Sequence, residues 1–311
     1  MFEYLNSLPE DTEYIDFLGK FIIYLPDLTR FKNLKKLNCS YNKLTSLPPL
    51  NENLEILYCH NNKLTSLPEF NKKLKIIHCH NNELTSLHLN EKLEIIHCEC
   101  NQLISLHLNE SLKELYCHNN KLTSLHLNEK LEIIHCDYNQ LTSLHLNEKL
   151  EILHCGRNQL TSLHLNVSLK ELHCGRNQLT SLHLNENLQE LCCNHNQLTS
   201  LHLNEKLETL YCGHNQLTSV SLSNTSLYIF SYKNNPLYEI INSDNQDIIN
   251  EKLKILHNFR YLYYCLKYKK RFRDLLWIKI REPKIRERYS HDYLVANLHE
   301  DTDLDYVLEN W

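Results

Sequence analysis

The chain has 311 residues, of which 23% are charged, and a formal net charge of −5 at pH 7. This mild charge indicates no strongly acidic or basic partner, and four glycines and seven prolines leave no long flexible linker. No apolar run reaches the roughly 18 residues of a membrane span. The acidic start, Met1–Asp11, lacks the basic segment of a signal peptide. We therefore expect an intracellular protein without membrane contact.

Residues 1–33 resemble an incomplete copy of the segment that follows them. Ile15 aligns with Leu37 and Phe17 with Cys39, while Lys20 stands where later copies have asparagine. A terminal repeat faces water on one side, so it is expected to depart from the common pattern. We predict an N-terminal cap with a degenerate repeat over residues 1–33.

Eleven near-copies of one unit follow over residues 34–241, spaced by 19 or 20 residues. Ten of them keep the skeleton L-x-x-L-x-C-x-x-N-x-L-x-x-L, with isoleucine or valine at some of the leucine positions, and in the last copy Tyr232 takes the place of the cysteine. A fixed period of this length with this skeleton is typical of a leucine-rich repeat. Apolar and polar residues alternate around the cysteine, which predicts a short strand with one buried face. We predict a mainly β and irregular solenoid with a parallel sheet on one face and extended return segments, because 19 residues leave no room for a helix.

Thirteen cysteines would indicate disulfides in a secreted protein, but ten of them occupy one position of the repeat. A free cysteine behaves as a small apolar residue, and burial makes its thiol unreactive. We expect a reduced interior column, a cysteine ladder, which fits a reducing compartment. Its members are Cys39, Cys59, Cys79, Cys98, Cys117, Cys136, Cys155, Cys174, Cys193 and Cys212.

An asparagine follows three residues after the cysteine in every copy, where the strand must turn. A buried amide there can bond to backbone groups that the turn leaves unpaired. We therefore predict a structural asparagine ladder of Asn42, Asn62, Asn82, Asn101, Asn120, Asn139, Asn158, Asn177, Asn196, Asn215 and Asn235.

Residues 242–311 change to a helical period. Ile249, Leu253 and Leu256 recur at helix spacing, and Pro283 should end the helix. We predict an α-helical C-terminal cap or tail.

The segment 260–288 of this tail holds eleven Lys or Arg among aromatic residues. Such a mixture is found in nucleic-acid-binding segments, but the acidic residues 289–311 can fold back and neutralise it. We expect the self-paired cap rather than nucleic-acid binding, and whether the basic helix binds anything stays open.

The residue before each cysteine should point outward from the sheet, and there the copies carry mostly tyrosine and histidine. A further outward position, two residues after the cysteine, adds tyrosine and arginine in the middle copies. These residue types are favoured at protein interfaces, but they also stack well between neighbouring strands; both interpretations stay open. The candidate partner-binding residues are Tyr58, His78, His97, Tyr116, His135, Tyr138, His154, Arg157, His173, Arg176 and Tyr211.

Histidines beside cysteines raise the question of a metal site. His78 and Cys79 point to opposite faces of a strand, so they cannot bind one tetrahedral zinc ion. Histidines on neighbouring repeats could bind a metal, for instance His78 with His97 and Cys100, but no C-x-x-C or H-x-x-x-H spacing supports this. We expect no metal and no cofactor. Because no nucleophile with a base, no paired carboxylates and no phosphate-binding loop appear, we expect no enzyme.

A second histidine series should lie on the return segments as a polar rung between buried leucines. Imidazoles about 5 Å apart disfavour one another's protonation, so we expect stability to fall toward pH 5. The series is His88, His107, His126, His145, His164, His183 and His202.

The repeat at residues 54–68, Leu-Glu-Ile-Leu-Tyr-Cys-His-Asn-Asn-Lys-Leu-Thr-Ser-Leu-Pro, resembles the short repeats of bacterial leucine-rich effectors and internalins. Its cysteine position is similar to that of the cysteine-ladder internalins. The motif Cys-x-x-Asn-x-Leu-Thr-Ser-Leu and the tail over 281–311 resemble leucine-rich repeat proteins of mimivirus-type giant viruses. These resemblances imply a repeat scaffold and no catalytic residue, although some relatives carry ubiquitin-ligase or F-box domains beside their repeats.

We predict a non-catalytic scaffold that binds an unidentified protein through the exposed strand face. If the lineage is viral, the partner is a host protein and the setting is the host cytoplasm. One alternative is a structural component that assembles with itself or within a particle. Another is the substrate-recognition subunit of a ubiquitin ligase whose catalytic machinery is on another chain. The oligomeric state stays open.

Overall fold

The structure is a computed structural model that describes residues 2–221, 227–241, 243, 248, 249, 251 and 252. The chain divides into two units, Met1–Leu253 and Lys254–Trp311. The expected helical cap with its basic helix and acidic end therefore lies almost wholly outside the described residues. Within them, no helix is long and apolar enough to cross a membrane.

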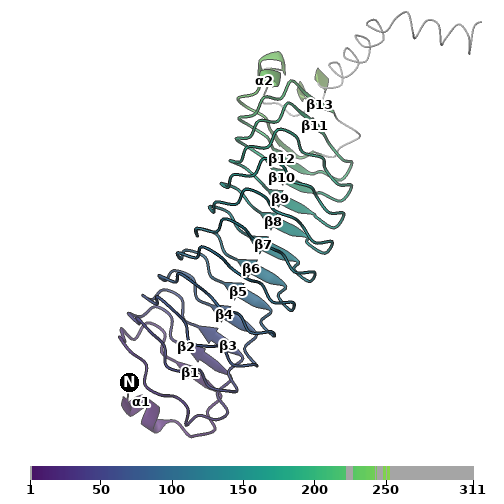
Figure 1. Cartoon of the computed structure of the whole chain (residues 1–311). Coiled ribbons are helices and arrows are strands. Elements are labelled where there is room, and N and C mark those ends of the chain that lie inside the picture. Colours follow the sequence, from purple (N-terminus) through teal and green to yellow (C-terminus); the bar gives the residue numbers. More distant parts are fainter. Residues whose placement is uncertain (1, 222–226, 242, 244–247, 250, 253–311) are drawn as a thin grey trace, which may run out of the picture. The chain divides into compact units, whose positions relative to one another are not determined.

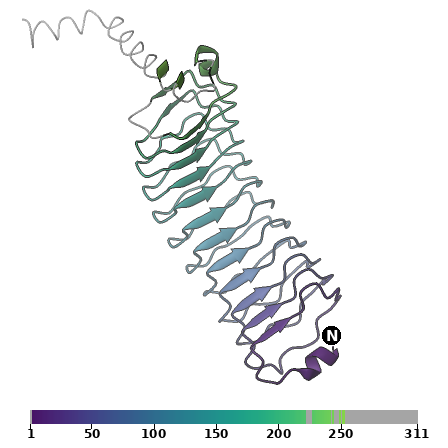
Figure 2. The same cartoon turned by 180° about the vertical axis from the view of Figure 1, so that it is seen from behind.

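Successive coils of the first unit each place one short strand beside the strand of the coil before (Figure 1). The described strands form a parallel sheet of twelve, ordered β1 to β10, then β12 and β14. Figure 2 shows these strands along one face of the stack, with the extended return segments behind them. The predicted parallel solenoid of coils about 19 residues long is confirmed. The strands are β1 (Tyr14–Asp16), β2 (Lys36–Asn38), β3 (Ile56–Tyr58), β4 (Ile76–His78), β5 (Ile95–His97), β6 (Glu114–Tyr116), β7 (Ile133–His135), β8 (Ile152–His154), β9 (Glu171–His173), β10 (Glu190–Cys192), β12 (Thr209–Tyr211) and β14 (Ile229–Ser231).

The elements outside this sheet lie near the two ends of the described unit. Helix α1 (Phe2–Ser7) precedes β1, which pairs in parallel with β2. Ile15 is the partner of Leu37, as the alignment of the degenerate first repeat predicts. On the return side, β11 (Ser200–His202) pairs with β13 (Ser219–Ser221), and helix α2 (Pro236–Ile241) follows β14. Two return segments therefore become strands where the pattern predicts only extended backbone.

The interior is built from the same positions in every coil because all the strands pair in phase. In the coil of β7, Leu131, Ile134 and Cys136 are all fully buried. The ten repeat cysteines are buried and none forms a disulfide. Burial raises the pKa of the Cys39 thiol to about 12, and it raises the pKa of the others as well. These thiols therefore act as small apolar side chains.

The asparagine ladder joins each coil to the one before it. The Asn139 Nδ2 donates to the carbonyl oxygens of Cys117 and Cys136, both at 3.1 Å, and its Oδ1 accepts the Leu122 N–H at 3.0 Å. One buried amide thus satisfies backbone groups of two coils, which would otherwise lie unpaired. The predicted structural role of this series is confirmed.

A second asparagine series closes the corner before each strand, and the sequence interpretation did not assign it. The Asn147 Nδ2 donates to the Leu131 carbonyl at 3.0 Å, while its Oδ1 accepts the N–H groups of Lys149 and Leu150. The equivalent amides are those of Asn71, Asn90, Asn109, Asn128, Asn166, Asn185 and Asn204. Asparagine therefore holds both corners of the strand.

The return-segment histidines lie differently from the prediction. Leu87 is buried, but its neighbour His88 is exposed, and His107, His126, His145, His164, His183 and His202 are exposed as well. The expected polar rung between buried leucines is therefore wrong. Side chains alternate in an extended segment, and this alternation turns each histidine to solvent.

Candidate functional site

The outward face of the sheet carries the predicted candidate residues. In β7 the middle residue, Ile134, is buried, while Ile133 and His135 on either side are half-buried. The same alternation holds for every strand from β2 to β10 and for β12. The candidates that end a strand are half-buried, and Tyr138, Arg157 and Arg176 are exposed.

The candidates at the strand ends form a continuous stack, which we call the ring column: Tyr58, His78, His97, Tyr116, His135, His154 and His173. Their ring centroids follow one another at 4.8, 4.1, 4.1, 4.8, 3.9 and 4.1 Å. Four of the six neighbouring pairs are stacked face to face, whereas Tyr58 meets His78 edge-on and Tyr116 is tilted against His135. Both kinds of ring contact contribute to the stability of the sheet. Cys192 interrupts the column before Tyr211, which has no such ring contact among the described residues.

Burial and crowding control the charge of the ring column. Burial lowers the pKa of His78 to about 4, and the neighbouring imidazole of His97 adds to the effect. Burial also lowers the pKa of His135 to about 4, together with the imidazole of His154. The His78 and His135 rings are therefore neutral at physiological pH, and they present ring edges and nitrogen atoms rather than positive charge.

A second outward series lies at the turn just after each strand, and its backbone conformation was not predicted. Tyr138, Arg157 and Arg176 have φ angles of 54°, 53° and 58°, in the left-handed region. That region costs a residue with a Cβ atom about 1–2 kcal/mol. Asn61 and Asn81 occupy the same position in earlier coils, and asparagine tolerates it. Asparagine at this position is the signal from which the turn could have been predicted.

We call the later members of this series the turn ridge: Tyr138, Arg157, Arg176, His195 and His214. The Arg157 guanidinium lies over the Tyr138 ring, 4.4 Å from its centroid, and His195 stacks on His214 at 4.1 Å. Tyr138 is 46% exposed. Large side chains thus stand in solvent on strained turns, and bulky residues at strained backbone positions are often functional.

A third outward series lies between the ring column and the turn ridge, and the sequence interpretation left it out of the candidates. This inner column consists of His60, His80, Glu99, His118 and Asp137, all half-buried. His60 stacks on His80 at 4.3 Å, and the Asp137 Oδ1 accepts the Gly156 N–H at 2.7 Å. Residues two apart on a strand share a face, so the motifs His78-Cys79-His80 and His97-Cys98-Glu99 could have revealed it.

Groups with metal-binding chemistry occur on this face, in combinations that differ from the set considered in the sequence. In the described part of the chain, one group of three histidines and two groups of two histidines and a glutamate bring their ligand atoms within 4.8 Å of one another. None of them includes Cys100. The groups are His60, His78 and His80; His80, His97 and Glu99; and His154, Glu171 and His173.

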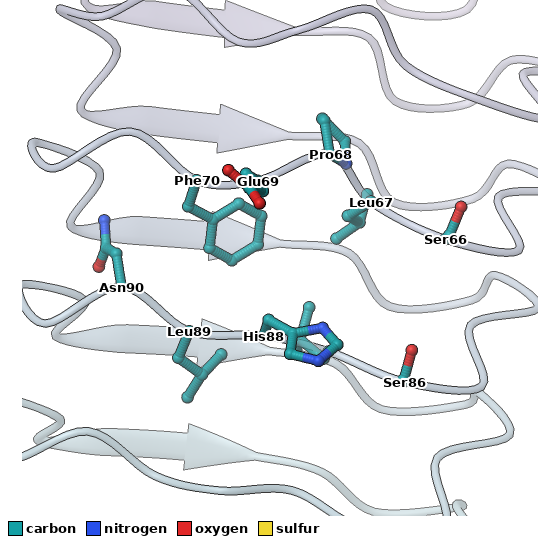
Figure 3. A pocket seen from close by; sticks show the side chains of 10 residues that line it. Ser66, Leu67, Pro68, Glu69, Phe70, Ser86, His88, Leu89 and Asn90 are labelled. Carbon is teal, nitrogen blue, oxygen red and sulfur yellow. The ribbon is translucent and has the colours of Figure 1, made fainter.

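The return face carries shallow pockets between successive coils. One is lined by the segments 66–70 and 86–90, which run side by side in Figure 3, with His88 and Phe70 among the residues that surround it. An equivalent pocket is lined by the same repeat positions in the segments 143–148 and 162–166. Because the pocket recurs with the repeat, we attribute it to the spacing of the coils rather than to a unique ligand site.

Comparisons with known proteins agree with this geometry. The family "Leucine Rich repeats (2 copies)" matches residues 32–72. YopM from Yersinia enterocolitica WA-314 superposes with a TM-score of 0.67 at 29% identity, over 69% of this chain and 49% of that one. The functional domain of InlJ from Listeria monocytogenes, which includes a cysteine ladder, superposes with a TM-score of 0.57 at 25% identity, over 72% of this chain and 64% of that one.

A further structure, the leucine-rich effector protein YopM from Yersinia pestis, superposes with a TM-score of 0.59 at 27% identity, over 74% of this chain and 79% of that one. No curated protein sequence gives a significant match. The chain spans about half of the Y. enterocolitica structure and under two thirds of the InlJ domain.

The repeat skeleton, the parallel sheet and these neighbours define the class of fold: the described part of the chain forms a leucine-rich repeat solenoid. Its fold is one that typically serves protein–protein interaction.

Proposed function

We propose that the chain is a non-catalytic scaffold that binds a protein partner through its strand face. The observation that carries this proposal is the turn ridge, where Tyr138, Arg157 and Arg176 hold strained left-handed turns. Glycine or asparagine would occupy these turns at lower cost, so the stability of the fold does not explain the residues chosen. Tyrosine and arginine are the residue types that contribute most to binding at interfaces.

The ring column supplies the rigid part of the proposed surface. Its rings are held by contacts with neighbouring rings, so they lose little side-chain freedom when a partner docks. The neutral imidazoles of His78 and His135 offer donors and acceptors without the cost of burying a charge. The turn ridge and the ring column together form an amphipathic surface that repeats along the stack. Each coil that contains both series contributes one residue of each.

The direct test removes the centre of this surface. His135, Tyr138, His154 and Arg157 are replaced together by alanine, and partner recovery from lysate is quantified by mass spectrometry against the unchanged chain. We expect the recovered partner to fall at least about 10-fold, since central contacts dominate interface energy. A matched variant with His126, His145, His164 and His183 replaced on the return face should recover the partner normally. Equal recovery with both variants would place binding elsewhere.

The narrower functional hypotheses stay proposals with tests of their own. Self-assembly as a structural or particle component predicts light scattering that rises with protein concentration beyond that of a monomer. If the chain is the substrate-recognition subunit of a ubiquitin ligase, a catalytic ligase chain should be found among the recovered partners. The viral lineage and host-cytoplasm setting rest on the repeat motif and the tail over 281–311, whereas the solved neighbours named above are bacterial.

A further inference from the structure

Three polar atoms of the inner column are buried without a hydrogen-bond partner: Nδ1 of His60, Nδ1 of His80 and Oε2 of Glu99. They lie on consecutive coils, just beyond β3, β4 and β5. Buried polar atoms in native proteins are almost always paired with protein, water or an ion. The unpaired atoms of His80 and Glu99, on neighbouring coils, therefore indicate a missing ligand between these two side chains.

The geometry around Glu99 suits a metal ion. The Glu99 Oε1 lies 3.5 Å from the Nδ1 of His80 and 3.7 Å from the Nδ1 of His97. In a tetrahedral site with metal–ligand bonds of about 2.1 Å, two ligand atoms are separated by roughly 3.4 Å. All three ligand atoms already lie within 4.8 Å of one another, so small side-chain rotations complete the set.

We propose that His80, His97 and Glu99 bind one divalent transition-metal ion of the Zn²⁺ type. Two imidazoles and one carboxylate are a ligand set that zinc accepts, with the fourth position left to water or to a group from another molecule. Mg²⁺ and Ca²⁺ prefer sites made of oxygen ligands alone, so the same residues discriminate against them. The proposal concerns the free chain and does not depend on a protein partner.

Neighbouring rings hold the two ligand imidazoles in place. His78 stacks on His97 at 4.1 Å, and His60 stacks on His80 at 4.3 Å. Such outer contacts fix the orientation of ligand rings in metal sites. His60 and His78 are thus support for the site rather than members of the ligand set.

The group of His154, Glu171 and His173 provides an internal contrast. The His154 Nε2 lies 2.7 Å from the Glu171 Oε1, and the His173 Nε2 lies 3.0 Å from the Glu190 Oε1. These side chains already satisfy one another, so an ion would have to replace existing hydrogen bonds. This difference singles out the Glu99 group and supplies a matched control.

The test is calorimetric titration of the full chain with ZnCl₂ at pH 7.5, after a chelator has been dialysed away and with the thiols kept reduced. We expect one saturable equivalent, no response to MgCl₂, and a rise of the thermal midpoint with Zn²⁺. Glu99→Gln and His97→Asn should each weaken binding at least about 10-fold. The matched variant Glu171→Gln should bind Zn²⁺ as the unchanged chain does. Circular dichroism checks that each variant is folded. If only one of the two ligand variants folds, that variant is compared with Glu171→Gln.

Co²⁺ serves as a spectroscopic probe that distinguishes imidazole and carboxylate ligands from thiolates. We expect visible d–d bands without the intense near-ultraviolet band of cobalt bound to thiolate, and we expect loss of these bands in Glu99→Gln. Three results would overturn the proposal: no saturable Zn²⁺ binding, binding that Glu99→Gln and His97→Asn leave unchanged, or a thiolate band that shows cysteine to be the ligand.

Discussion

The interior and the outward face of the same coils follow opposite rules. Asn139 and Tyr138 are adjacent, yet one is buried with its amide bonded to two coils and the other stands in solvent on a strained turn. The interior positions repeat nearly unchanged, because every coil must present the same shape and hydrogen bonds to its neighbour. The outward positions vary in residue type. The residues that repeat to hold the coils together are therefore different from those of the turn ridge, on which the proposed binding depends.

The asparagine ladder should show the largest effect of a single interior change. Asn139→Ala leaves the Leu122 N–H and two carbonyl oxygens without this partner, and each buried unpaired group costs about 1–3 kcal/mol. We expect a loss of about 4 kcal/mol in the free energy of unfolding, measured by urea titration. Gln140→Ala, at the exposed neighbouring position, should change it by less than about 0.5 kcal/mol. Similar losses for both would remove the distinction between interior and exterior.

Acidification should destabilise the protein through the strand face rather than the return face. Burial lowers the pKa of His60, His78 and His135 from 6.5 to about 4. Between these values the unfolded chain binds more protons than the folded one, so stability is complete above pH 6.5 and falls as the pH falls toward 4. Because these side chains are half-exposed, solvent screening reduces the effect, and we expect each histidine to lower the free energy of unfolding by roughly 1 kcal/mol at pH 5.

The measurement is the thermal midpoint at pH 7.5 and pH 5. Replacing His60, His78 and His135 by glutamine should reduce the difference between the two midpoints. Replacing His126, His145 and His164 on the return segments should leave the difference as in the unchanged chain. Equal thermal midpoints of the unchanged chain at pH 7.5 and pH 5 would contradict the expected loss of stability through these histidines.

Cys192 and Cys193 offer the same comparison within one dipeptide. Cys193 is fully buried, whereas Cys192 is half-buried on the outward face, where its Sγ lies 3.4 Å from the Asn194 amide. Cys193→Ser places a hydroxyl in the apolar interior, at a cost of about 2 kcal/mol. Cys192→Ser keeps a polar neighbour and should cost less than about 0.5 kcal/mol. Urea midpoints measure both; a larger loss for Cys192→Ser would reverse the assignment of faces.

The turn ridge should show the smallest effect on stability. Arg157→Gly relieves the left-handed backbone strain, while the added freedom of the unfolded chain opposes the gain. We expect a net change within about 0.5 kcal/mol. The control is His154→Gly at an extended position, which gains no such relief and also loses two ring contacts and the hydrogen bond to Glu171, so it should cost more than about 1 kcal/mol. A large loss for Arg157→Gly would mean that the ridge supports the fold.

The fold was predictable because the same pattern of apolar and polar residues recurs in the successive copies of the repeat. The alternation around Cys136 correctly predicted which residues face inward, and the position of Asn139 predicted the turn that it bonds. The conformation of Tyr138 was harder to predict, since aromatic residues rarely adopt the left-handed region. The exposure of the return-segment histidines was not predicted, because the repeat period alone does not show which side chains of an extended segment face the solvent.

The candidate surface was predictable only in part. The ring column follows from one outward position of the repeat, but its stacking distances depend on rotamers that the sequence does not state. The group around Glu99 joins side chains of two coils at two different repeat positions. The set considered from the sequence, His78 with His97 and Cys100 on neighbouring repeats, differs from this group, although His80 and Glu99 are equivalent positions of consecutive coils.

The most direct test of the central claim compares two double variants in one urea titration. The first replaces Asn120 and Asn139 by alanine, and the second replaces Tyr138 and Arg157 by glycine. If the interior amides hold the fold and the ridge is free for binding, the free energy of unfolding falls sharply in the first variant. In the second variant it stays within about 1 kcal/mol of the value for the unchanged chain. Comparable falls in both variants would contradict the separation of stability from specificity.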